Sequence, residues 1–268
     1  MSEGESPYLS KIWLKSYDDF VPAEVEIDTE LDLAEMLKRT AKDYPNSLCY
    51  DFMGTTENYR EFEQNVICFA NFLLQNGIKR GDRIAIQIPN SPQYMIALWG
   101  AFYIGCTVTG MSFLLKPTEI IYQLKDSGSK VILTLDSFYD EFVEEALRSG
   151  HTDIEIVIPT NITDMMKLNP VLKWLGKKAK KIPVGKVVPI EGIKYVWFKE
   201  IMLKYAGGKV PNIKLDPEED IAFLQYTGGT TGLPKGAILT HRNQVANLTQ
   251  TLTWTDVDAK KGEGSSVY

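Results

Sequence analysis

Apolar residues recur along most of the chain with the two periods that helices and strands require. At helical spacing they predict helices over residues 31–44, 59–75, 92–104, 117–125 and 137–149. Short apolar runs predict buried strands over residues 48–53, 83–88, 106–109, 130–135 and 154–158. Residues 54–58 are predicted to form a turn. Because strands and helices alternate, we expect an α/β fold with mostly parallel sheets flanked by helices.

One long apolar stretch allows two interpretations. From Ile84 to Leu115 the sequence has no charged residue, and this length alone would suit a membrane-associated structural protein. Pro89 and Pro92 interrupt the stretch, however. A helix from Pro92 to Ile104 would be about 20 Å long, against a hydrocarbon core of about 30 Å. We therefore favour a buried strand, helix and strand.

The composition narrows the class of protein. The 268 residues are 44% hydrophobic and 24% charged, as in an ordinary globular protein, and the formal net charge of −6 argues against a global nucleic-acid footprint. Cys49, Cys68 and Cys106 form no C-x-x-C pair, which indicates free thiols in a reducing compartment and neither disulfides nor a zinc site. The acidic, polar first residues are no secretory signal. The expected location is cytoplasmic.

Residues 165–190 differ in composition from the rest of the chain. They contain seven lysines and no acid, interleaved with apolar side chains. The simpler interpretation is an exposed connector, because runs of charge are usually solvated, and Pro170 and Pro183 limit a continuous helix. The alternative is peripheral contact with the inner face of an anionic membrane through Lys173, Lys177, Lys178, Lys180 and Lys181.

A loop of glycine, threonine and proline lies between two apolar runs, and residues 221–243 form a predicted strand–loop–strand unit. A strand over Ile221–Tyr226 enters the loop and a run over Ala237–Leu239 leaves it. Glycines permit positive φ and close approach of a ligand. Successive N–H groups can line an anion site, to which hydroxyls and an ammonium add donors. The candidate phosphate-binding residues are Thr227, Gly228, Gly229, Thr230, Thr231, Gly232, Lys235 and Gly236.

Two other loop types share part of this composition. A plain β-hairpin loop needs about two to five residues, whereas ten residues separate Tyr226 from Ala237. The Walker A loop requires G-x-x-x-x-G-K-[ST], but Lys235 follows Pro234 and precedes Gly236. The spacing therefore favours a different phosphate-binding loop.

The string from Tyr226 to Gly236 resembles the signature loop of the adenylate-forming superfamily, with Gly228 where Ser is usual. Together with the flanking Leu-Gln and Leu-Thr-His-Arg-Asn, it resembles the long-chain fatty acyl-CoA ligases in particular. Segments that begin at Gly77, Pro89, Leu98 and Tyr122 are similar to acyl-CoA synthetase segments in family order. The resemblance implies that residues 1–268 are the N-terminal portion of the large domain of the adenylate-forming (AMP-binding) fold, incomplete and without the C-terminal domain.

This resemblance implies ATP-dependent activation of a fatty-acid carboxylate as an acyl-adenylate, followed by thioester formation with CoA. ATP, Mg²⁺ and CoA are the expected cofactor and co-substrates, and a homodimer is one expected assembly. Thr230 and Lys235 are the first candidates to hold the β- and γ-phosphates, and no Mg²⁺ ligand is evident. The family's later elements have no match before Tyr268, so we expect this chain to be inactive alone. A non-catalytic nucleotide-binding module is the alternative.

Histidine chemistry contributes little to these expectations. His151 and His241 are the only histidines, too few and too far apart for a His-rich metal site. His241 follows the second apolar run of the loop unit and precedes a predicted helix. A structural or capping role is therefore expected for it, and not the role of a base.

Overall fold

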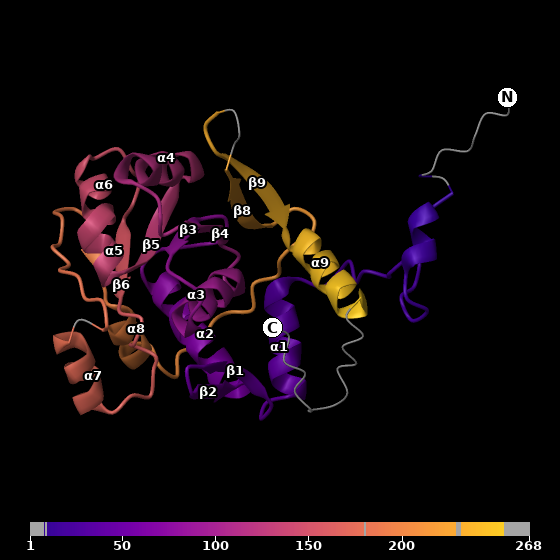
Figure 1. Ribbon diagram of the computed structural model, residues 1–268, viewed down its shortest axis with the longest axis horizontal. Helices are drawn as coiled ribbons and strands as arrows, with labels where there is room; N and C mark the ends of the chain where they lie inside the picture. Colours follow the sequence, from indigo (N-terminus) through magenta and orange to yellow (C-terminus); the bar gives the residue numbers. More distant parts are fainter. Residues whose placement is uncertain (1–7, 9, 180, 229–231, 255–268) are drawn as a thin grey trace.

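The computed structural model describes residues 8, 10–179, 181–228 and 232–254. Its centre is a seven-stranded sheet covered by helices on both faces (Figure 1). In spatial order the strands are β7 (Lys194–Tyr195), β6 (Ile156–Thr160), β5 (Ser129–Leu135), β3 (Arg83–Gln87), β4 (Thr107–Gly110), β8 (Ile221–Thr227) and β9 (Lys235–Thr240). Every neighbouring pair is parallel except β8 and β9. The predicted fold class is confirmed.

Successive side chains along a strand point to opposite faces of the sheet, so the core consists of two layers, one on each face. Ile84, Ile86 and Leu133 lie fully buried on one face of the sheet, in the same cluster as Phe69 and Phe102. Helices that contribute to this layer include α1 (Leu33–Asp43), α2 (Tyr59–Gln75), α3 (Pro92–Tyr103) and α8 (Phe198–Lys204), and Val245 adds to it from the helix that follows β9. The apolar stripe predicted for residues 59–75 is therefore core.

The opposite face of the sheet is covered by a shorter set of helices. Ala85, Ile132 and Val157 pack there against α4 (Pro117–Ser127) and against the segment that follows β5. The helix predicted over residues 137–149 is not continuous. It consists of α5 (Asp136–Phe138), one π-helical turn over Tyr139–Val143, and α6 (Glu144–Arg148). The wider turn leaves Tyr139 and Val143 both buried against the sheet.

The uncharged run over residues 84–115 folds as the expected buried strand, helix and strand: β3, α3 and β4. Pro92 occupies the first position of α3, and the Ser91 hydroxyl caps it by accepting a hydrogen bond from the N–H of Tyr94. α3 has 12 residues. Within the described ranges, no helix is long and apolar enough to cross a membrane.

A small antiparallel hairpin lies apart from the large sheet and corrects one expectation. β1 (Leu48–Phe52) pairs with β2 (Thr55–Asn58), so residues 55–58, predicted as part of a turn, form a strand. The turn is confined to Met53 and Gly54, which both have positive φ, as a tight two-residue hairpin turn requires. Its geometry depends on a non-glycine residue in a rare conformation.

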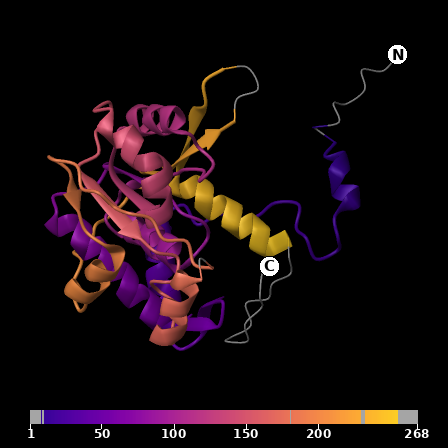
Figure 2. The same cartoon turned by 60° about the vertical axis from the view of Figure 1, so that its left-hand side comes forward.

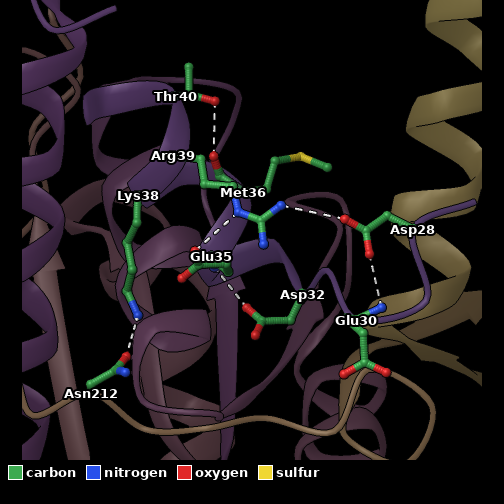
Figure 3. A network of polar contacts seen from close by, with 9 residues as sticks. All are labelled: Asp28, Glu30, Asp32, Glu35, Met36, Lys38, Arg39, Thr40 and Asn212. Atoms are coloured by element: carbon green, nitrogen blue, oxygen red, sulfur yellow. Dashed lines mark hydrogen bonds and ion pairs between the residues drawn. The ribbon is translucent and has the colours of Figure 1, made fainter. Parts of the chain in front are cut away.

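Polar contacts hold the start of α1 and the segment that leads into it (Figure 3). The Asp32 carboxylate accepts a hydrogen bond from the Glu35 N–H at 2.8 Å, a cap that stabilises a helix by about 1 kcal/mol. Arg39 forms ion pairs with Glu35 and with Asp28. These pairs are exposed and add little to stability. They orient the chain that leads into α1.

Two segments project from the compact body in both views (Figures 1 and 2). One is the β8–β9 hairpin, and the other is α9 (His241–Trp254), which follows it directly. A short 3₁₀ helix over Ile12–Ser16 lies farther out, beyond α9. Tyr17 meets the ring of Trp254 edge-on at 4.7 Å between centroids. This contact joins the N-terminal segment to the end of α9.

Candidate functional site

The predicted phosphate-binding loop is the tip of the β8–β9 hairpin. The antiparallel ladder runs from Ile221 opposite Thr240 to Thr227 opposite Lys235. Three of the candidates, Thr227, Lys235 and Gly236, are therefore strand residues, and only residues 228–234 connect the strands. The candidates Gly229, Thr230 and Thr231 lie outside the described residues.

The glycines of this hairpin do not use the backbone freedom that we expected of them. Gly228, Gly232 and Gly236 all lack positive φ, so the conformational argument is wrong for these three. Space explains Gly236 better, because a Cβ there would lie 3.2 Å from the ring of Tyr226 on the opposite strand. A Cβ at Gly228 or Gly232 would meet no atom of the described residues within 4 Å. Both backbones are therefore open to a ligand.

Thr227 and Lys235 form the last pair of the ladder, at the mouth of the loop. Residues directly opposite each other in an antiparallel pair place their side chains on the same face. Both residues are exposed, and the described ion pairs do not include Lys235. A hydroxyl donor and an ammonium are thus brought together beside the two open glycine backbones.

Helix α4 holds the tip of the hairpin from the other side. The Tyr226 hydroxyl donates to the Asp126 carboxylate at 2.5 Å, and the Tyr122 hydroxyl donates to the carbonyl of Pro234 at 2.8 Å. Burial, and then the hydrogen bond to Asp126, raise the pKa of Tyr226, so that its hydroxyl stays protonated and donates. β4 pairs with β8 at one position, Val108 opposite Phe223.

The loop borders a crevice of about 420 Å³ at the carboxyl ends of β3, β4 and β8. Ligands of open α/β sheets bind at this edge, where neighbouring strands continue in opposite directions. The chain leaves β4 towards β5, whereas it leaves β8 towards β9 on the outer side. Ile86, Met111, Tyr94, Thr227 and Gly228 line the crevice. Its floor is apolar and its rim towards the loop is polar.

The crevice suits an anion better than a cation. Its described lining contains no carboxylate. Gln123 on its wall is occupied, because its amide donates to the Thr109 hydroxyl and to the carbonyl of Gly110. No group of three or more His, Cys, Asp or Glu side chains with metal-ligand geometry occurs in the part of the chain that the structure describes. The described residues therefore fit a phosphate chain and supply no evident Mg²⁺ site.

His241 has a structural role, as its position predicts. It is fully buried at the start of α9, where its Nδ1 accepts a hydrogen bond from the N–H of Leu33 at 3.3 Å. Its ring meets Phe102 edge-on at 5.4 Å. Burial lowers the pKa of His241, so the ring is held neutral with its proton on Nε2. It joins α9 to α1 and lies away from the crevice lining.

The sequence did not identify the residues of α4 as part of the site. Tyr122 and Asp126 belong to a segment whose resemblance to acyl-CoA synthetases supported only the fold. Their partners lie 112 and 100 residues away in the sequence. The spacing of a tyrosine and an aspartate one helical turn apart was the only available signal.

Comparison with known proteins places the chain in a family. The family model described as "AMP-binding enzyme" matches residues 37–267. The chain belongs to this family. It is 34% identical over 250 residues to a long-chain-fatty-acid–CoA ligase of Yersinia pestis, and 32% identical over 254 residues to one of Bacillus subtilis. These matches cover 90% and 94% of this chain, but only 42% and 44% of the relatives. This AMP-binding enzyme chain therefore spans less than half the length of those relatives.

Solved structures agree with the fold. A long-chain-fatty-acid-CoA ligase from Archaeoglobus fulgidus superposes with a TM-score of 0.68 at 22% identity, over 91% of this chain and 43% of that one. A luciferase-like enzyme from Zophobas morio superposes with a TM-score of 0.62 at 20% identity, over 82% and 45%. Both solved structures thus share the fold of this chain.

Proposed function

We propose that this chain supplies the pyrophosphate-binding half of the active site of a long-chain fatty acid–CoA ligase. The pairing of Thr227 with Lys235 at the mouth of the loop, beside the open crevice, carries the proposal. Family membership and the names of the curated relatives support it. In the parent protein, a fatty-acid carboxylate oxygen attacks the α-phosphorus of ATP and pyrophosphate leaves. The CoA thiol then displaces AMP to give the thioester.

The residues of this chain act on the leaving group. Lys235 places its ammonium, and Thr227 its hydroxyl, against the β- and γ-phosphate oxygens, while the backbones of Gly228 and Gly232 leave room for close approach. Fixed donors stabilise charge that develops on the leaving pyrophosphate, which is the main task in transfer at phosphorus. Bound Mg²⁺ would neutralise part of that charge. Thr230 and Thr231 are proposed to add two further hydroxyls.

Titration of ATP into the chain tests the phosphate site. Replacing Lys235 by Ala should weaken binding about tenfold to a hundredfold, because a hydrogen bond to a charged group contributes about 1.5–3 kcal/mol. Lys199→Ala, at an exposed position on α8, is the matched control and should leave the affinity unchanged. Equal ATP affinity in the two variants would show that Lys235 does not contribute to ATP binding, and would refute the proposed phosphate site.

A chimera separates a ligase from a non-catalytic nucleotide-binding module. The corresponding part of the Bacillus subtilis relative is replaced by this chain, and pyrophosphate release with ATP, palmitate and CoA is measured. Restored release that Lys235→Ala abolishes supports the ligase, whereas a chimera that binds ATP without turnover supports the module. Residues 1–268 alone should release no pyrophosphate. Contact with a membrane through the lysine segment, and homodimer formation, stay predictions.

A further inference from the structure

A short helix in the lysine-rich segment presents apolar side chains to solvent. α7 (Pro170–Lys178) lies at the periphery of the molecule, distant from the β8–β9 hairpin in Figure 1. Val171, Trp174 and Leu175 are 62%, 59% and 46% exposed. With Lys178 they follow the spacing i, i+3, i+4 and i+7, which places all four on one face of the helix. A helix that packs on the core of its own protein buries its apolar face, whereas α7 exposes these apolar side chains to solvent. We call this surface the outward face of α7.

The other side of α7 is closed by the chain that follows it. The N–H groups of Lys181 and Ile182 both donate to the carbonyl of Gly176, at 2.9 and 3.2 Å. The side chain of Ile182 lies so close that a Cβ on Gly176 would be 2.7 Å from its Cδ1. Gly176 points away from the outward face, because it lies about 140° around the helix from Val171 at 3.6 residues per turn. The chain that follows α7 thus covers the side opposite to the exposed residues Val171, Trp174 and Leu175.

The charged side chains within residues 165–190 are all basic, although the carboxylate of Asp140, outside this range, accepts a hydrogen bond from the N–H of Lys186. Residues 165–190 contain seven lysines and no acid, although the whole chain has a net charge of −6. Lys178, Lys181 and Lys186 are exposed. The Lys178 ammonium lies 5.0 Å from the centroid of the Trp174 ring, which joins the cationic and apolar parts of the surface. The side chains of Lys173 and Lys177, and the whole of Lys180, lie outside the described part.

Both ends of the segment are fixed to the body of the protein. At one end, the backbone N–H of Lys167 donates to the Thr55 hydroxyl at 2.9 Å. At the other end, the buried amide of Asn161 donates to the carbonyl of Pro183 at 2.9 Å. The backbone at Gly185 also approaches the carbonyl of Asp136. The segment that contains α7 is therefore attached to the body of the protein on both sides of the helix.

We propose that the outward face of α7, with its flanking lysines, is a docking surface for an anionic lipid bilayer. Tryptophan and aliphatic side chains on one helix face, bordered by lysines and free of acids, have the chemistry of a helix that lies in the membrane interface. A second copy of the chain fits this surface poorly. A twofold contact through α7 would place lysines against lysines. The surface needs no nucleotide, so it is independent of the proposed ligase chemistry.

Sedimentation of the 268-residue chain with vesicles tests the proposal. Vesicles of phosphatidylcholine alone are compared with vesicles that contain equal parts of phosphatidylglycerol, each at low and high salt. Binding should require the anionic lipid and should weaken with salt. Trp174→Ala should lower the partition coefficient about tenfold through lost apolar burial, and Lys178→Ala about fivefold through lost attraction to the surface.

Matched variants distinguish binding through the outward face of α7 from nonspecific binding to vesicles. Leu203→Ala and Lys199→Ala change an exposed apolar residue and an exposed lysine on α8 and should bind vesicles as the unchanged chain does. Because Trp174 is exposed, its variants should melt at the unchanged temperature. Absence of binding, equal binding to neutral vesicles, or equal losses in the α8 variants would overturn the proposal. So would self-association that Trp174→Ala abolishes, since the occupant would then be a second copy.

Discussion

Two hydrogen bonds with α4 should stabilise the position of the candidate phosphate-binding loop against the body of the protein. Tyr122→Phe removes the bond to the Pro234 carbonyl, and Asp126→Ala removes the acceptor of the Tyr226 hydroxyl. Each hydrogen bond contributes about 1 kcal/mol to stability. Although a carboxylate accepts the Tyr226 hydroxyl, that bond contributes no more than the other, because Asp126 is exposed to solvent. Since β8 pairs with β4 at one position only, little else restrains the tip. The double variant should therefore lower the free energy of opening the hairpin by about 2 kcal/mol.

Amide hydrogen exchange measured on a peptide covering residues 226–240 reads this opening directly. A loss of about 2 kcal/mol corresponds to roughly thirtyfold faster exchange, while exchange in β3 and β5 stays unchanged. Asp126→Asn keeps an acceptor oxygen and should restore most of the protection. Tyr103→Phe is the matched control, because it removes a phenol hydrogen bond of 2.8 Å, to Glu63, on a distant surface. Unchanged exchange in the double variant would refute the role of α4.

Two further predictions concern the effect of His241 and of Gly185 on the stability of the folded chain. The pKa of His241 is lowered by burial, so the unfolded chain takes up a proton that the folded chain excludes. Stability should fall as the pH drops below about 6.5, by at most about 1.4 kcal/mol per pH unit, and His241→Gln should flatten that dependence in urea titrations at several pH values. Gly185→Ala would place a Cβ 2.1 Å from the Asp136 carbonyl oxygen, and it should cost about 1–3 kcal/mol in thermal unfolding. Gly192→Ala, whose Cβ meets no atom but whose φ is positive, should cost only about 1 kcal/mol.

Local signals in the sequence were sufficient for most of the body of the fold. The bounds of α2 were predicted as Tyr59–Gln75 and are confirmed, because Asn58 and Glu61 form a capping box and Gly77 has the positive φ expected just beyond a helix end. The buried strand, helix and strand over residues 84–115 followed from an uncharged run broken by two prolines. Each of these elements depends on residues close in sequence.

Rare backbone conformations, and features that depend on distant residues, could not be predicted. The strand β2 requires positive φ at Met53, which a non-glycine residue rarely adopts. The role of Gly236 depends on the ring of Tyr226 across the ladder and not on its own backbone angles. The exposure of the outward face of α7 could not be predicted from the sequence either, because the same apolar residues would also suit a helix packed against the core. Composition indicated the candidate phosphate-binding loop, and the contacts of Tyr122 and Tyr226 show how α4 holds it.

The position of β9 has a consequence for how the chain behaves at high concentration. β9 is the last strand of the sheet, and among the described strands it pairs only with β8. Its outer N–H and C=O groups face outward, and Ile238 on this strand is 62% exposed. Such a strand is a template on which another extended chain can add. The hairpin that carries the candidate phosphate-binding loop is thus also an open sheet edge at which this polypeptide can undergo sheet extension and aggregation.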